Sequence, residues 1–128
     1  MQDDSMLNTT DIVNVNNNNI IFRKKFKIQN IVFYVKKIHK ITTFFEPEDD
    51  EKSRIVTITY SFKSMNMEVP HFKVLKSIVK SVVGELKNVK KMLMNKNGFV
   101  AFNITAHNDD IVIKIAFSKK SGINIDLE

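Results

Sequence analysis

The chain has 128 residues, a formal net charge of +6 and 43% hydrophobic residues, which fits one domain with a buried core and excludes wholesale disorder. It has no cysteine, so disulfides and thiolate chemistry are excluded. Neither a signal peptide nor an apolar run long enough to span a bilayer is evident, so we expect an intracellular protein, cytoplasmic or in the host cytoplasm if viral.

The chain begins with a polar segment that ends in a run of asparagines. Low-complexity polar sequence of this kind predicts a flexible N-terminal tail over residues 1–19. Residues 20–128 are then expected to form a single α+β domain. Within it, the acidic residues 46–51 predict a solvated hairpin loop.

Two strands are predicted before that acidic loop. In the first strand, Phe22, Phe26 and Ile28 share one face and basic residues share the other. Residues 29–30 predict a two-residue turn, which leads into a second strand from 31 to about 44.

A third strand and a long helix follow. The strand is indicated by alternating apolar side chains at Val56, Ile58, Tyr60 and Phe62. The helix is predicted from about Pro70 to Met94, and it carries one apolar stripe: Leu75, Val79, Val82, Leu86, Val89 and Leu93. Packing of this stripe on a sheet is the preferred interpretation, although its spacing would also suit a coiled-coil partner.

Three more alternating segments, with apolar positions near 100–106, 111–117 and 123–127, predict the last strands. Their short connections favour an antiparallel meander. The expected fold is therefore α+β, with a mostly antiparallel sheet of order β-β-β-α-β-β-β covered by one long amphipathic helix.

The turn at residues 29–30 also predicts a cross-strand register in which paired residue numbers sum to 59. Phe26 then faces Phe33 on one side of the hairpin, and Lys25 faces Tyr34 on the other. This register gathers a basic face around an aromatic ring: Arg23, Lys25, Lys27, Tyr34 and Lys36. A basic face with an exposed aromatic is what single-stranded nucleic acid requires, although an ordinary solvated sheet face has the same composition.

A second group of lysines follows one flank of the predicted helix: Lys73, Lys76, Lys80, Lys87 and Lys91. They form either a solvated flank or an edge that contacts phosphates. Beyond them lie small or uncharged residues: Ser77, Ser81, Gly84 and Asn88. This stripe would let a second helix approach closely, so a homodimer is one expectation, and plain solvent exposure is the other.

Catalytic and metal-binding patterns are missing from the sequence. His39, His71 and His107 are too far apart to form a local zinc motif, and the acids at 46–51 lack the spacing of a calcium loop. The three glycines are too scattered to build a phosphate-binding loop. We therefore expect no enzyme, no cofactor and no metal site.

The charge pattern leads to a functional hypothesis of non-catalytic, single-stranded and weakly sequence-selective nucleic-acid binding. Arginine, which reads bases and phosphates specifically, occurs only at Arg23 and Arg54. The alternative is a protein–protein interaction module from a virus or mobile element, such as a dimeric adaptor, an inhibitor, or an assembly protein of a virion or secretion machine. No membrane partner is expected.

Overall fold

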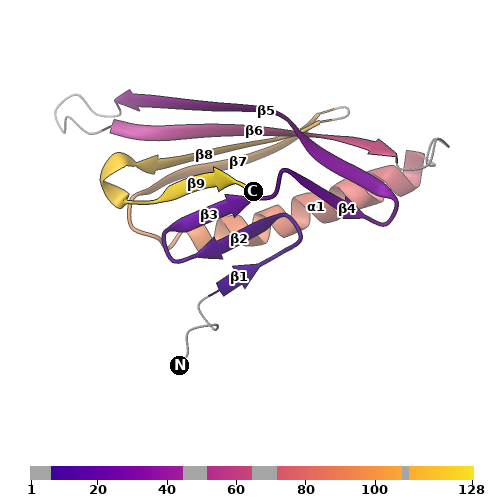
Figure 1. The fold of residues 1–128 in the computed structure, drawn as a ribbon, viewed down its shortest axis with the longest axis horizontal. Coiled ribbons are helices and arrows are strands. Elements are labelled where there is room, and N and C mark those ends of the chain that lie inside the picture. Colours follow the sequence, from indigo (N-terminus) through magenta and orange to yellow (C-terminus); the bar gives the residue numbers. More distant parts are fainter. Residues whose placement is uncertain (1–6, 45–51, 65–71, 108–109) are drawn as a thin grey trace.

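The computed structural model describes residues 7–44, 52–64, 72–107 and 110–128. These residues form an α+β fold in which a five-stranded sheet, a four-stranded sheet and an α-helix enclose one core (Figure 1). The predicted antiparallel sheet with a single long helix is confirmed.

The five-stranded sheet has the strand order β4-β5-β6-β8-β7, and every neighbouring pair is antiparallel. Its strands are β4 (Lys25–Ile28), β5 (Ile31–Phe44), β6 (Lys52–Ser64), β7 (Phe99–His107) and β8 (Asp110–Ser118). Alternation puts one side of each strand into the core. For example, Ile58 of β6 pairs with Ile113 of β8, and both are fully buried.

The helix α1 (Phe72–Leu93) covers the core side of this sheet. Its expected apolar stripe is confirmed, because Val82, Leu86, Val89 and Leu93 belong to the core together with the strands. The stripe therefore packs on the sheet and not in a coiled coil. The expected helix start at Pro70 and the acidic loop at 46–51 lie outside the described residues.

Gly98 allows the chain to turn from the helix into β7. Its φ angle is +86°, and a Cβ atom at this position would lie 2.4 Å from the Cβ of Ser121. Ser118 also donates a backbone hydrogen bond of 2.8 Å to the carbonyl of Gly98. A side chain here would be strained and would collide with its neighbour.

The four-stranded sheet corrects the prediction of a tail over residues 1–19, because residues 7–9 and 13–16 are strands within it. Its order is β1-β2-β3-β9, with β1 (Leu7–Thr9), β2 (Val13–Asn16), β3 (Asn19–Phe22) and β9 (Asn124–Leu127). Val13 and Val15 are buried in the core. Asn17, with φ 55°, turns β2 into β3, so part of the asparagine run is a hairpin turn.

The expected first strand is in fact two strands in different sheets. Phe22 ends β3 and Phe26 lies in β4, and the chain crosses between the sheets at Arg23. The crossing is held from both sides. The Arg23 amide donates to the carbonyl of Ile12 over 2.8 Å, and the Tyr60 hydroxyl donates to the carbonyl of Arg23.

The expected meander of the last three strands is correct only for β7 and β8. Both edges of β8 are occupied, by β6 and by β7, so β9 has no free edge there. It pairs instead in parallel with β3, with Ile20 opposite Ile125. Two further hydrogen bonds come from the large sheet: Lys40 donates to the carbonyl of Ile125 in β9 over 3.3 Å, and Arg54 donates to that of Ile123, just before β9.

We predict that Leu86→Ala lowers the free energy of unfolding by about 2–5 kcal/mol, because Leu86 is fully buried in the middle of the stripe and its truncation leaves a cavity. Val74→Ala is the control on the same helix, since Val74 is 47% exposed and its truncation should cost within about 0.5 kcal/mol. Urea unfolding followed by circular dichroism measures both. Equal midpoints for the two variants would contradict the packing.

Candidate nucleic-acid interface

The predicted hairpin register is confirmed for all four residues of β4. Lys25 pairs with Tyr34 and Phe26 with Phe33. On the core side, the rings of Phe26 and Phe33 stack with centroids 5.0 Å apart, and Tyr60 meets Phe26 edge-on at 5.2 Å. This aromatic packing fixes which side of the hairpin is buried, so Lys25 and Lys27 point to the opposite side and are exposed.

That opposite side is the outer face of the five-stranded sheet. Residues of α1 and of the small sheet belong to the same core as the buried side of the large sheet, so the outer face is the side turned away from both. In Figure 1, α1 and the small sheet lie below β6 and below most of β5. Tyr34 lies on this face with 39% of its surface exposed. The predicted grouping of a ring with the hairpin lysines is therefore present in the structure.

Lys36 joins the same face through a β-bulge. The register between β5 and β6 shifts between Val35 and Lys37. The Lys36 ammonium, 59% exposed, lies 3.4 Å from a carboxylate oxygen of Asp110. An exposed pair of this kind contributes little to stability, and it leaves Lys36 partly neutralised.

Arg23, by contrast, lies outside the paired residues of β4 and β5. Its predicted partner was Lys36, but Arg23 lies before β4 in the crossing between the two sheets. The predicted pairing of Arg23 with Lys36 is wrong, because the backbone of Arg23 is bound to Ile12 and Tyr60 instead. The place of the Arg23 side chain on the basic face stays a prediction.

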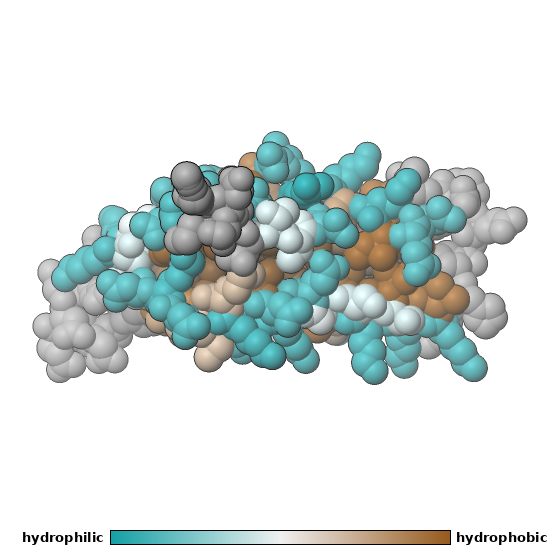
Figure 2. Space-filling view, turned by 90° about the horizontal axis from the view of Figure 1, so that it is seen from below, coloured by the Kyte–Doolittle hydropathy of each residue, from teal (hydrophilic) through white to brown (hydrophobic). Residues whose placement is uncertain are grey.

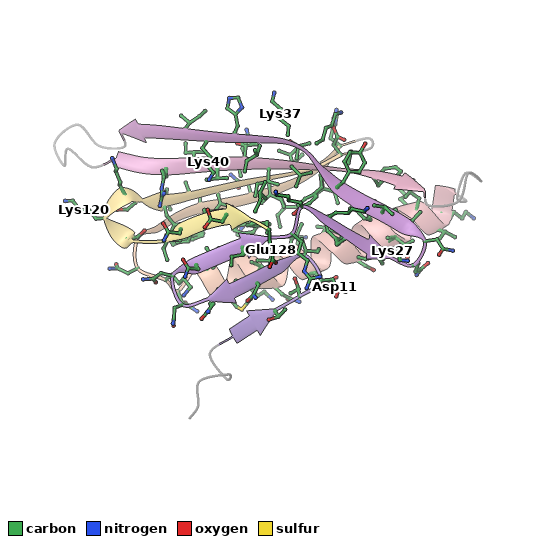
Figure 3. The ribbon with its side chains drawn as sticks, viewed as in Figure 1. Asp11, Lys27, Lys37, Lys40, Lys120 and Glu128 are labelled. Atoms are coloured by element: carbon green, nitrogen blue, oxygen red, sulfur yellow. The ribbon has the colours of Figure 1, made fainter. Side chains whose placement is uncertain are left out.

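Among the described side chains, two lysines of the outer face were missed from the sequence. Lys37 projects from β5 away from the helix (Figure 3), and Lys114 of β8 pairs with Thr57 of β6, whose side of the sheet is the outer one. Both are exposed. The bulge at Lys36 shifts the alternation by one residue, so counting along β5 from Tyr34 puts Lys37 on the wrong face.

Beside Tyr34 lie two buried oxygen atoms without a hydrogen-bond partner, Ser61 Oγ and Asp110 Oδ1. The register places Ser61 directly between Tyr34 and Asp110. Buried acceptors are normally satisfied, so these two atoms are exceptions, and their burial keeps them out of reach of a ligand on the surface.

The helix lysines form a separate surface. All five are exposed, and the first three line a groove between α1 and β7 with a volume of about 580 Å³. The groove is lined by Lys73, Lys76, Ser77, Val79, Lys80, Val83 and Ala106. Lys87 and Lys91 continue the row on the same side of the helix. Figure 2 shows the molecule from below, where apolar surface is visible between hydrophilic side chains.

Glu85 lies on the opposite flank of the helix, against the turn that precedes β2. Partial burial and the nearby carboxylate of Asp11 raise the pKa of Glu85, and a hydrogen bond from the Asp11 backbone opposes this rise. Between the two flanks, Ser77, Ser81, Gly84 and Asn88 are exposed, with open space around Gly84. The homodimer expected from this stripe stays a prediction.

Other site chemistry is limited in the described part of the chain. His39 and His107 are exposed. No group of three or more histidine, aspartate or glutamate residues is arranged there to hold a metal ion. In the same ranges, no helix has the length and hydrophobicity needed to cross a bilayer. Comparisons with protein-family models, with curated proteins and with solved structures give no match.

We predict that Glu85→Gln raises stability at neutral pH and has no effect in acid. Because the folded-state pKa of Glu85 lies above the ordinary value of 4.5, ionisation of Glu85 destabilises the folded state. This destabilisation is absent well below pH 4.5 and grows as the pH rises through the folded-state pKa. Thermal unfolding between pH 3 and 8 tests this, with Asp126→Asn as the control for loss of one exposed acid. A stabilisation of equal size at all pH values would contradict it.

Proposed function

We propose that the protein is a non-catalytic binder of single-stranded nucleic acid, and that the outer face of the five-stranded sheet is its binding surface. The observation that supports this most directly is the hairpin register, which brings Lys25 and Lys27 beside the exposed ring of Tyr34. Lys36, Lys37 and Lys114 extend the positive charge across the sheet. Among the described side chains of this face, Asp110 is the one acid.

The lysines and the tyrosine would contribute to binding in different ways. Lysines neutralise backbone phosphates and release condensed counterions, which makes affinity depend steeply on salt. Tyr34 offers a flat ring on which a base can stack, and stacking tolerates every base.

Weak sequence selectivity follows from the placement of the arginines. Arg54 donates to the carbonyl of Ile123 and so holds β9. Arg23 lies in the crossing between the sheets, outside the hairpin. Arg54 is thus engaged in a backbone contact, and with so few arginines in the chain we expect contacts to phosphates and rings to dominate.

The competing proposal is a protein–protein interaction module, in the form of a homodimer, adaptor, inhibitor or assembly protein of viral or mobile-element origin. Binding to oligonucleotides separates the two. If the protein does not bind a single-stranded oligonucleotide at low salt, the proposal of nucleic-acid binding is wrong, and the proposal of an interaction module replaces it.

We predict that Lys25→Ala/Lys27→Ala makes the dependence of log affinity on log salt shallower by roughly 1.4 units, since each phosphate contact on a single strand contributes about 0.7. Fluorescence anisotropy with labelled oligothymidylate across a salt series measures the slope. Lys119→Ala/Lys120→Ala is the control, because it removes the same charge at the far end of the molecule (Figure 3). Equal slopes for the two double variants would contradict the proposed surface.

We predict that Tyr34→Ala weakens binding by about 1–3 kcal/mol and leaves the salt slope unchanged, because it removes a stacking platform and no charge. Ile41→Ala is the control: Ile41 is also on β5 and is 45% exposed. If the wild type binds but neither Tyr34 nor the hairpin lysines matter, the binding site lies elsewhere, and the lysine row of α1 becomes the candidate.

A further inference from the structure

We propose that the groove between α1 and β7 binds an extended acidic peptide, which adds to the five-stranded sheet as a new strand along the free edge of β7. This site is separate from the outer face, and the partner is a protein segment. Three observations carry the proposal: an unpaired strand edge, an apolar floor beside it, and a row of lysines above it.

The first observation is the edge of β7. The strand order of the large sheet ends at β7, and within the described ranges no strand pairs with its far side. A nine-residue edge strand offers a row of backbone N–H and C=O groups to an incoming chain. The other end of the sheet is less open, since next to β4 the amide of Lys24 donates to the carbonyl of Glu128 over 2.8 Å.

The second observation is the floor of the groove. Ala106 is the strand residue that faces α1 there, and its small side chain leaves space against Val79 and Val83. A larger residue at Ala106 would fill this space. The volume of about 580 Å³ is enough for several peptide side chains.

The third observation is the lysine row. α1 and β7 are joined by the short segment 94–98, so they run in opposite directions, and Ala106 near the end of β7 lies against Lys73 to Lys80 near the start of α1. From Lys73 to Lys87 the helix rises roughly 21 Å, which matches about six residues of an extended strand. The row therefore follows the edge over much of its length.

The positive charge of the lysine row determines which kind of occupant the groove favours. A second copy of β7 would bring a second lysine row against the first, and like charges disfavour that pairing. Single-stranded nucleic acid would gain phosphate contacts, but the groove lining includes no aromatic ring for a base, unlike the face around Tyr34. A peptide with acidic side chains on its helix-facing side complements the positive charge of the row and also pairs with the strand edge.

The probe is a labelled nine-residue peptide with threonine at even positions, valine at the centre and glutamate at the other odd positions, so that one face is acidic. Fluorescence anisotropy at low salt measures its binding to the full chain. We expect binding by the wild type and no binding of the matched peptide with lysine in place of glutamate. Failure of the acidic peptide to bind, or equal binding of both peptides, overturns the proposal.

Two methylated versions of the probe test backbone pairing without changing the protein. One carries N-methyl groups on its odd residues and the other on its even residues. Only one set of amides can face β7, so one version should bind about tenfold or more weakly and the other should keep its affinity. Equal effects of the two sets would mean that the backbone is not paired, and the proposal fails.

Protein variants then locate the site. Lys73→Glu/Lys80→Glu should weaken peptide binding about tenfold, and Lys119→Glu/Lys120→Glu on the 3-10 helix Lys119–Ser121 should not. Ala106→Phe should abolish binding by filling the groove, and Ala106→Ser should keep it. Lys25→Ala/Lys27→Ala should also keep it, which distinguishes this site from the nucleic-acid surface. Loss of binding in that last variant, or no loss in the first, overturns the proposal.

Two further outcomes would assign the groove to another occupant. If oligothymidylate displaces the peptide and Lys73→Glu/Lys80→Glu removes oligonucleotide binding, the groove binds nucleic acid. If light scattering shows a wild-type dimer that Ala106→Phe converts to a monomer, the edge is an interface between two copies. Either result overturns the acidic-peptide proposal.

Discussion

The parallel pairing of β3 with β9 is the interaction on which the arrangement of both sheets depends. It joins the N-terminal hairpin to the end of the described chain, and backbone hydrogen bonds on either side of Arg23 tie this pair to the large sheet. Side chains of β5 and β6 also bind this segment, since Lys40 donates to the carbonyl of Ile125 in β9 and Arg54 to that of Ile123 just before it. Backbone groups that would otherwise be buried without partners are thereby satisfied, and the small sheet closes one side of the core.

The fold class, the helix and the hairpin register were predictable because each depends on local periodicity. The hydrophobic stripe of α1 and the alternation in β6 and β8 need no knowledge of distant residues. The small sheet was not predictable in the same way. Val13 and Val15 lie among polar residues, and they are buried in a core to which residues far away in the chain contribute. The alternation of Val13, Val15, Ile20 and Phe22 around an asparagine turn was nevertheless a readable hairpin signal.

The part of the candidate interface that depends on the hairpin register was predictable from the sequence. Lys25, Lys27 and Tyr34 lie where their register puts them. The expected pairing of Arg23 with Lys36 was wrong because the chain leaves one sheet at Arg23, and Lys37 was missed because a bulge reverses the side on which it points. Both errors come from departures from a regular strand, which follow from tertiary pairing and leave no pattern in the sequence.

The pairing of β3 with β9 also has a consequence for the order of folding. Asn19 and Asn124, which hydrogen-bond through their side chains across these strands, are 105 residues apart in the chain. Contacts of such long range require a costly loop closure before they contribute stability, whereas the hairpins of the large sheet and α1 can form locally. During synthesis on the ribosome, β3 cannot pair with β9 until residues 124–127 have been made. The exposed N-terminal hairpin is then the segment most open to aggregation or to capture by a chaperone.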